Sequence, residues 1–476
     1  MIPLASRGIV IGLLSTLLSA GCVTFSKDGG IGPAKTVAEE RLGKRAALIT
    51  TEDQRRDVQR ETDALLAQPL TPDDAMQIAL LNNRGLQATY ADLGIAEADL
   101  VQAGRLRNPR FTTTRTRADN GFNFKNETSL MFPIVELLTM PLAIKMERRR
   151  FEAVQLQVAG DVLRLGLETR EAWYRAVAAN ETVRYYGQVL DAAEASAELG
   201  RRMARAGNMN KRDQLREQAF YADAATQLAR ARVEAVASRE RLTRLMGLWG
   251  AQADYRLAER LPDLPKAPGD YADLEAIALR ERLDVVAAKA EAEGIARSLG
   301  LTKATRFINV LELGPATVME QGTAIKKGYE ISLEVPIFDW GTARVAKAEA
   351  QYMQAVNRIA QRAVEARSEV REAYAAYRAA WDMSRHYRDE IVPVRKRISE
   401  ENMLRYNGML LSVFELLADA REQVMAVNGY IESLRNYWLA ETELRAALGG
   451  RLPPTPARTG ALTDKPTTAA AAAPKE

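Results

Sequence analysis

Polar and apolar residues alternate along short parts of the chain, and these parts lie between long stretches with the spacing of amphipathic helices. In the clearest case Tyr329, Ile331, Leu333, Val335 and Ile337 alternate with Glu330, Ser332 and Glu334. A period of two places the two sets on opposite faces of a β-strand. The pattern predicts strands at about 110–118 and 126–134, and again at about 306–318 and 327–337.

Turn and capping residues mark where the predicted elements begin and end. Asp119-Asn120-Gly121 separates the first two strands and is typical of a hairpin turn. Thr71-Pro72-Asp73-Asp74 combines a hydroxyl N-cap, a proline at the first helical position and acids in the first turn, and predicts a helix to about Gly104. No proline lies between Pro141 and Pro262, so we expect helices over about 141–206 and 210–246.

The second half of the chain repeats this plan. A helix is predicted over about 271–301, and long helices flank Asn407-Gly408, with Pro393 expected to bend its helix locally. Four short sequences recur in the same order at offsets of 199 to 203 residues: Ile78-Ala79-Leu80 with Ile277-Ala278-Leu279, Gly94-Ile95-Ala96 with Gly294-Ile295-Ala296, Phe132-Pro133-Ile134 with Val335-Pro336-Ile337, and Arg170-Glu171-Ala172 with Arg371-Glu372-Ala373. A mainly α protein with β-hairpins is therefore predicted, internally duplicated as helix, β-hairpin, long helix and helix.

The N-terminus has the composition of an export signal. One arginine precedes an apolar stretch over 8–18 and the small residues Ser19-Ala20-Gly21, and this is too short for a spanning helix. Ending such a signal at Cys22 resembles a bacterial lipobox, although Ser19 stands where leucine is usual. Lipidation of Cys22 is thus predicted, and Val23 after it, in place of aspartate, points to the outer membrane. The alternative is an ordinary secreted protein with an inert thiol.

We therefore expect five segments. They are a signal peptide at 1–21, a lipid-anchored N-terminal segment at 22–70 that lies along the surface of the main body, a first structural repeat at 71–270, a second repeat at 271–450, and a disordered Pro/Thr/Ala-rich tail at 451–476.

Charge and rare residues exclude several classes of protein. The chain has 66 Lys and Arg against 62 Asp and Glu, and the signs are interleaved, so no basic block indicates nucleic-acid binding. The single cysteine excludes a disulfide framework, and the single histidine, His386, leaves little for catalysis or metal ligation. The lysines within Gly322–Gly328 lack the P-loop spacing, and no HExxH is present. We expect no enzyme, no metal and no cofactor apart from the lipid on Cys22.

Ten-residue strands with one apolar face match transmembrane β-strands, although the same alternation would suit a half-buried sheet in a soluble protein. Aromatic residues at the helix-proximal strand ends, Phe132, Phe338 and Trp340 among them, could form an interfacial girdle or could simply plug the space between sheet and helices. Four strands cannot close a barrel, and open edges are not tolerated in lipid. Spanning strands would therefore require oligomerisation, and three copies would supply twelve strands.

The predicted helix lengths exclude a compact globular domain. A helix over 141–206 is 66 residues, roughly 100 Å at ~1.5 Å per residue, which is too long for a globular domain. Apolar residues step by seven along it at Phe151, Val158, Leu165 and Ala172, with many alanines between, as in coiled coils.

Over nearly the whole mature chain, the sequence resembles the TolC family of outer-membrane efflux proteins. Two segments carry the resemblance, one from Leu283-Asp284-Val285 through Glu291 to Ala296, the other Leu333-Glu334-Val335-Pro336-Ile337-Phe338-Asp339-Trp340-Gly341. The resemblance implies a homotrimer whose twelve-stranded barrel in the outer membrane continues as a long periplasmic α-helical barrel. It also implies a passive, non-catalytic exit duct with two partners, a periplasmic membrane-fusion adaptor and an inner-membrane transporter, often of the resistance-nodulation-division type.

The resemblance assigns two candidate sites. The turns that form the periplasmic tips would be Gly207-Asn208 and Asn407-Gly408, whose residue types suit the left-handed backbone of a tight reversal, and a plain turn is the alternative. The carboxylates of a pore constriction would be Asp213, Glu415 and Asp419. Glu415 and Asp419 are four residues apart and could form a ring of like charge under threefold symmetry, or belong to a solvated helix face.

Two other functions remain open. The chain could serve type I protein secretion, or it could be a lipid-anchored periplasmic coiled-coil scaffold that never enters the bilayer. Its methionines are scattered and not clustered in pairs, so they give no signal for or against a metal cargo. The substrate, whether a drug, a metal or another compound, cannot be predicted because the inner-membrane pump selects it.

Overall fold

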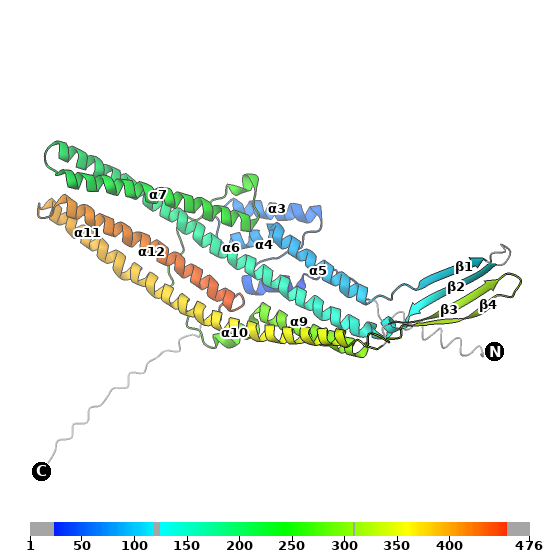
Figure 1. Cartoon of the computed structure of the whole chain (residues 1–476). Helices are drawn as coiled ribbons and strands as arrows, with labels where there is room; N and C mark the ends of the chain where they lie inside the picture. Colours follow the sequence, from blue (N-terminus) through cyan, green and yellow to red (C-terminus); the bar gives the residue numbers. More distant parts are fainter. Residues whose placement is uncertain (1–22, 118–123, 308–309, 455–476) are drawn as a thin grey trace, which may run out of the picture.

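The computed structural model describes residues 23–117, 124–307 and 310–454 of an elongated molecule. A four-stranded sheet forms one end, and long helices run from it to two tight turns at the other end (Figure 1). Cys22, the hairpin turn expected at Asp119-Asn120-Gly121 and most of the predicted tail lie outside the described residues.

The two halves of the chain contain their helices and strands in the same order. The first half consists of α4 (Pro72–Asn82), α5 (Arg84–Ala103), β1 (Arg110–Arg117), β2 (Phe124–Pro133), α6 (Ile134–Arg205) and α7 (Lys211–Met246). A 3₁₀ turn, η2 (Gly250–Ala253), follows. The second half consists of α8 (Leu274–Glu281), α9 (Leu283–Ala304), β3 (Leu311–Glu320), β4 (Lys326–Leu333), α10 (Thr342–His386), the π-helical turn η3 (Tyr387–Ile391), α11 (Val392–Asn407) and α12 (Val413–Ala447).

Each helical segment that leads to a strand pair is interrupted by one non-helical residue. The expectation of one continuous helix over 71–104 and another over 271–301 was therefore wrong at these two residues. The breaks are Asn83 and Arg282, which have extended backbone. The Asn83 side chain accepts a hydrogen bond from the Leu86 amide at 3.0 Å and donates one to the Leu245 carbonyl at 2.8 Å. It therefore caps α5 and ties the break to the end of α7.

Helix α6 begins at Ile134, seven residues before its expected start, and contains Pro141. A proline here removes one backbone hydrogen bond near the start of a helix of 72 residues, roughly 110 Å long at ~1.5 Å per residue. Pro393 lies in the first turn of α11, and a π-helical turn immediately precedes this helix. The local bend expected at Pro393 stays a prediction.

The two hairpins join in one antiparallel sheet of order β1-β2-β3-β4. The central pairing aligns Lys125 with Glu320 and Phe132 with Leu313. Strand β3 starts later than the predicted 306, and β4 ends at Leu333, four residues before the predicted 337. The Ile337 amide donates to the Val335 carbonyl at 2.9 Å, which turns the chain away from the sheet around Pro336.

The N-terminal segment contributes to the core as well as lying along the helical body. It forms α2 (Gly32–Val37), the π-helical turn η1 (Ala38–Leu42) and α3 (Glu52–Leu66). Ile31 and Ala34 are buried in one cluster with Val158 and Val162 of α6. The expectation of a purely superficial segment was therefore wrong for these residues.

A second core cluster joins the two halves near the middle of the molecule. Its aromatic side chains form a continuous chain of ring contacts through Trp173, Tyr174, Trp438, Tyr437, Tyr377, Tyr374 and Tyr271. The Trp438 indole donates to the Pro262 carbonyl at 2.9 Å and the Trp381 indole to the Pro265 carbonyl at 3.0 Å. These bonds satisfy the buried indole donors and fix the linker between α7 and α8.

Candidate functional site

The register of the sheet gathers large apolar side chains on one face of its helix-proximal part, where β1 contributes Phe111 and then continues with Thr113, Arg115 and Arg117. Residues opposite each other in an antiparallel pair lie on the same face. Phe111 pairs with Leu130, Phe132 with Leu313, and Leu313 with Ile331. Because strand residues alternate between faces, this set includes Tyr329 and Leu333 as well, and we call it the apolar face.

The apolar face is uncovered in the single chain. Phe111 is 65% exposed, Ile331 58% and Tyr329 77%. The opposite face is mainly polar, with Glu127, Glu312 and Glu330 on it, and it also carries the buried Met131. A contiguous apolar surface of this kind indicates contact with lipid or with another chain.

The sheet also has two unpaired edges, β1 and β4. Directions alternate across the four antiparallel strands, so β1 and β4 run antiparallel to each other. Each edge leaves a row of backbone donors and acceptors without a strand partner. Edge β4 of one copy could therefore pair antiparallel with edge β1 of another.

The predicted interfacial aromatics lie at the helix-proximal end of the sheet. Phe132 ends β2 and is 44% exposed, whereas Phe338 and Trp340, in the loop after β4, are 97% and 58% exposed. The Trp340 ring meets Phe307 edge to face with centroids 6.5 Å apart. The structure thus brings the predicted aromatics to the junction of sheet and helices without burying them.

The two predicted tip turns lie at the far end of the molecule and differ in conformation (Figure 1). Gly207 has a φ of 78°, as expected of a left-handed turn residue. In the other turn Gly408 has a φ of −81°, and the left-handed residue is Met409 at 59°. Met409 and Leu410 are 94% and 81% exposed, so the second tip presents apolar side chains to solvent.

The three predicted constriction carboxylates occupy different environments. Asp213 is 4% exposed, and its carboxylate accepts a hydrogen bond from the side-chain amide of Asn210, the N-cap of α7. The Asp213 backbone amide donates to the Asn210 side-chain oxygen at 2.9 Å. Glu415 is exposed and closes a capping box with Ser412 at the start of α12. Asp419 is 8% exposed, and among the described residues its Oδ2 has no hydrogen-bond partner. Glu415 and Asp419 therefore do not share one uniformly solvated face in the single chain.

A carboxylate that the sequence did not reveal links three helices near the tips. Glu217 is 2% exposed, its Oε2 accepts a hydrogen bond from Ser196 at 2.7 Å, and its Oε1 accepts one from Arg421 at 2.7 Å. These contacts join α7 to α6 and α12. Glu217 and Arg421 are about 200 residues apart in helices that contain many other charged residues, so no local sequence pattern indicates that they pair.

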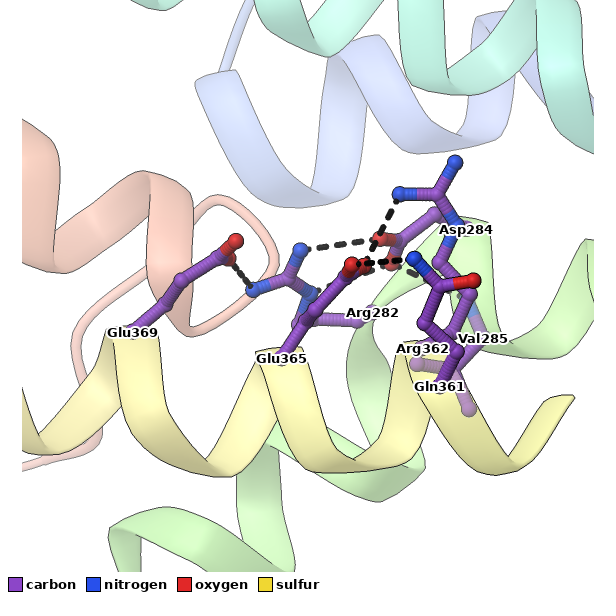
Figure 2. Close-up of polar contacts among 7 residues, drawn as sticks. All are labelled: Arg282, Asp284, Val285, Gln361, Arg362, Glu365 and Glu369. Carbon is purple, nitrogen blue, oxygen red and sulfur yellow. Dashed lines mark hydrogen bonds and ion pairs between the residues drawn. The ribbon is translucent and has the colours of Figure 1, made fainter. Parts of the chain in front are cut away.

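The sequence analysis also did not identify Arg282, at the break between α8 and α9, as a candidate site residue. The next three residues, Leu283-Asp284-Val285, begin one of the two segments that carry the family resemblance. Figure 2 shows its guanidinium between Asp284 and Glu369 of α10. It donates to the two Asp284 carboxylate oxygens at 3.0 and 2.8 Å and also bonds Glu369, with a side chain only 13% exposed. Burial alone would raise the pKa of Asp284, but the hydrogen bonds and charge of Arg282 outweigh it and lower that pKa.

Two further searches of the described residues bear on function. None of the described helices is both long and apolar enough to cross a membrane. Within the same ranges, no three or more His, Cys, Asp or Glu side chains are grouped as a metal site would require.

Comparison with known proteins gives one relative in sequence and several in structure. No protein-family model matches the chain. It is 25% identical over 276 residues to the cobalt-zinc-cadmium resistance protein CzcC of Cupriavidus metallidurans, a match that covers 57% of this chain and 64% of the relative. The match thus spans less than two thirds of that relative's length.

Two solved channels share the architecture. The outer-membrane channel OprN superimposes with a TM-score of 0.68 at 19% identity, covering 83% of this chain and 92% of its own. The outer membrane protein VceC of Vibrio cholerae superimposes with a TM-score of 0.67 at 16% identity, covering 82% of this chain and 98% of its own. The resemblance expected from the sequence is thereby confirmed at the level of the fold, and the chain has the fold of these outer-membrane proteins.

Proposed function

We propose that the chain is the outer-membrane channel component of a tripartite efflux system, a passive exit duct in a Gram-negative bacterium. The observation that carries the proposal is the apolar face, which has members on all four strands at the helix-proximal part of the sheet, with a mainly polar face behind it. In a closed barrel such a sheet would place the apolar face toward lipid and the polar face toward a water-filled lumen.

Closure requires more than one copy. An unpaired backbone group in lipid costs several kcal/mol, so the free edges β1 and β4 must be paired there. Their antiparallel directions allow β4 of one copy to pair with β1 of the next without a change of topology. Three copies would give a barrel of twelve strands, and their long helices would continue as a tunnel through the periplasm, lined by α6 and its counterparts.

The tip turns would face the partners of the duct. We propose that they meet a periplasmic adaptor and an inner-membrane transporter, in keeping with the family resemblance. The relative named for cobalt, zinc and cadmium resistance favours efflux over type I secretion. The cargo itself would be chosen by the pump.

Planar-bilayer recording of the purified protein tests the duct. We expect stepwise single-channel conductance, together with a trimer on chemical cross-linking and a heat-modifiable band on gels. A periplasmic scaffold would give a cross-linked oligomer without conductance. A monomer in detergent that gives no conductance would contradict both the closure of a barrel between copies and the proposed role as a duct.

Deletion strains would separate efflux from secretion, because loss of efflux raises sensitivity to toxic cations or drugs, whereas loss of secretion removes an exported protein from the medium.

A further inference from the structure

A groove lies where the helices meet the sheet. It is lined by the end of α5, the linker from α5 to β1, the end of β2 and the start of α6, and it encloses about 690 Å³. Its apolar lining includes Leu106, Phe132, Ile134, Leu137 and Met140. Leu106, Phe132 and Leu137 are 52%, 44% and 45% exposed, so the single chain leaves this lining open to water.

The charged side chains that line the groove balance one another. Three arginines face one aspartate and two glutamates: Arg105, Arg107, Arg150, Asp99, Glu136 and Glu147. Arg107 pairs with Glu136 at 2.6 Å, and Arg150 lies 3.7 Å from Asp99 and 3.6 Å from Glu147. A groove with no net charge suits an uncharged occupant such as an aromatic side chain better than an anionic lipid headgroup.

Four helices next to the sheet form a row in the order α5, α6, α9 and α10. Helix α6 packs on both α5 and α9, and α9 packs on α10 (Figure 1). The row has the same order as the strands β1-β2-β3-β4, each of which directly precedes or follows one of these helices. The ends of the row, α5 and α10, therefore lie on the sides of the two unpaired strand edges, β1 and β4.

The duplication of the chain relates the two hairpins to each other. Phe111 pairs with Leu130 in the first hairpin, and Leu311 pairs with Leu333 in the second. Equivalent residues of the two pairs are 200 and 203 positions apart. The same two shifts relate the repeated sequences in α5 and α9, and those at the end of β2 and just after β4.

Applied to the centre of the sheet, these shifts give a register between two copies. Phe132 of β2 pairs with Leu313 of β3. The equivalent pair across the free edges is Val335 of one copy with Thr113 of the next. This register keeps the apolar faces of the two sheets on the same side. It also brings the loop after β4, residues 336–341, level with residues 107–112 of the next copy.

The helices support the same alignment. Gly294 of α9 lies against α6, where an added Cβ would be 3.6 Å from the Cβ of Arg149. The equivalent positions at the ends of the row are Gly94 of α5 and Tyr352 of α10. Among the described residues, nothing lies within 4 Å of a Cβ added at Gly94. Helix α10 of a second copy can therefore run along α5, with its start beside the end of α5.

Both alignments bring the exposed ring of Phe338 to the groove. Phe338, between β4 and α10, is 97% exposed. Its equivalent 203 positions earlier is Val135 at the start of α6, a helix that contacts β3, and Val135 is half-buried. The difference is expected if Val135 already has its neighbouring strand within the chain, whereas Phe338 acquires its neighbour only from a second copy.

We infer that the groove is the seat of Phe338 from a second copy of the chain. The ring would pack on the lining formed by Leu106, Phe132 and Leu137, and it would remove from water apolar surface that is exposed in both copies. The inference rests on the proposed closure of a barrel between copies. It adds one defined contact, at the level where the barrel passes into the helical tunnel.

Photocross-linking in outer membranes tests the seat. The photoreactive amino acid p-benzoylphenylalanine would replace Phe338, which keeps an aromatic ring at this position. Irradiation should give covalent dimers and trimers on denaturing gels, and mass spectrometry should find the peptide around 338 joined to peptides that contain Leu106 or Leu137. Should the variant at 338 fail to assemble, the same amino acid at Leu137 should cross-link to the peptide that contains Phe338. The yield should be severalfold lower from Leu138, which is 74% exposed and does not line the groove.

The packing of the ring is tested by the stability of the trimer on gels. Phe338→Ala and Leu106→Ala should each lower the temperature at which the trimer dissociates. Because the two side chains would contact each other, the double variant should lose less than the two single losses together. Leu138→Ala is the control and should dissociate like the wild type.

The outcomes separate the seat from the duct. Adducts of the probe at 338 with lipid alone, with its own chain, or with another surface of a second copy would overturn the seat, as would strictly additive effects of Phe338→Ala and Leu106→Ala. If the same preparations are trimeric and conduct, the duct proposal still stands. A monomeric protein without conductance would overturn both.

Discussion

At the scale of single residues, Arg282 shows how one side chain organises a break in a helix. Its extended backbone separates α8 from α9, and its guanidinium satisfies Asp284 beside it and Glu369 across the interface with α10. Gln361 and Arg362 hold the neighbouring Glu365 at 2.8 and 3.2 Å on the same helix (Figure 2). The sequence lists these residues but does not show that they meet, because only the packing of α9 on α10 brings them together.

Arg282→Gln should destabilise the protein, because it removes hydrogen bonds between charged groups that are worth about 1.5–3 kcal/mol. Asp284 has a lowered pKa in the folded protein, so its contribution to stability is fully present above the unfolded pKa of about 3.9 and is lost as the pH falls through the folded value. The loss caused by Arg282→Gln should therefore be larger at pH 7 than at pH 3. Thermal unfolding at both pH values measures it.

Arg280→Gln is the matched control. Its side chain is 68% exposed and, within the described ranges, forms its ion pair with Glu281 at the surface, so a change within about ±0.5 kcal/mol is expected. Equal effects of the two substitutions, or an Arg282→Gln effect that does not shrink in acid, would contradict the role assigned to Arg282.

At the scale of elements, the junction between β2 and β3 converts two hairpins into one sheet. At Gly314 an added Cβ would lie 1.7 Å from the Leu130 carbonyl oxygen of the neighbouring strand. No side chain can be accommodated there unless the strands separate. The two hairpins were predicted from local alternation, but their union depends on this contact between residues about 180 positions apart.

Gly314→Ala should prevent the sheet from forming in its native register. The clash is with backbone, so the cost should exceed the roughly 1–3 kcal/mol typical of overpacking. We expect the folded, heat-modifiable species on gels to fall several-fold. Gly328→Ala, in the adjacent strand, has nothing within 4 Å of the added Cβ and should assemble like the wild type. Normal assembly of Gly314→Ala would show that β2 and β3 do not pair closely at this point.

At the scale of the whole molecule, the acidic residues near the tips can be interpreted only in relation to the assembled duct. Asp419 is buried with an oxygen that has no hydrogen-bond partner in the described chain, an arrangement that costs free energy in a single copy. Glu415, by contrast, stabilises its own helix through the capping box with Ser412. A ring of these carboxylates around a threefold axis remains a proposal that rests on the family resemblance.

The double variant Glu415→Ala with Asp419→Ala tests this ring. Removal of two carboxylates per copy should weaken cation selectivity and move the reversal potential toward zero in a salt gradient across a planar bilayer. Glu422→Ala, which removes an exposed acid of the same helix that pairs with Arg395, should leave the potential unchanged. An unchanged potential in the double variant would place both residues outside the pore.

The sequence by itself determined the local elements of this protein. Period-two alternation located the strands to within a few residues, and the absence of breakers fixed the long helices, because each of these signals acts between neighbours in the chain. However, these local sequence patterns did not place every break and end of the helices and strands correctly. They missed the break at Asn83, placed the start of α6 too late at Pro141 and extended the last strand past Leu333.

Tertiary structure decided what those elements do together. Only packing reveals that the apolar face is continuous across both hairpins, that Ile31 and its neighbours join the core of α6, and that Glu217 binds Arg421. The physical reason is the same in each case. These contacts join residues tens to hundreds of positions apart, and their free energies depend on distances that no pattern of neighbouring residues encodes.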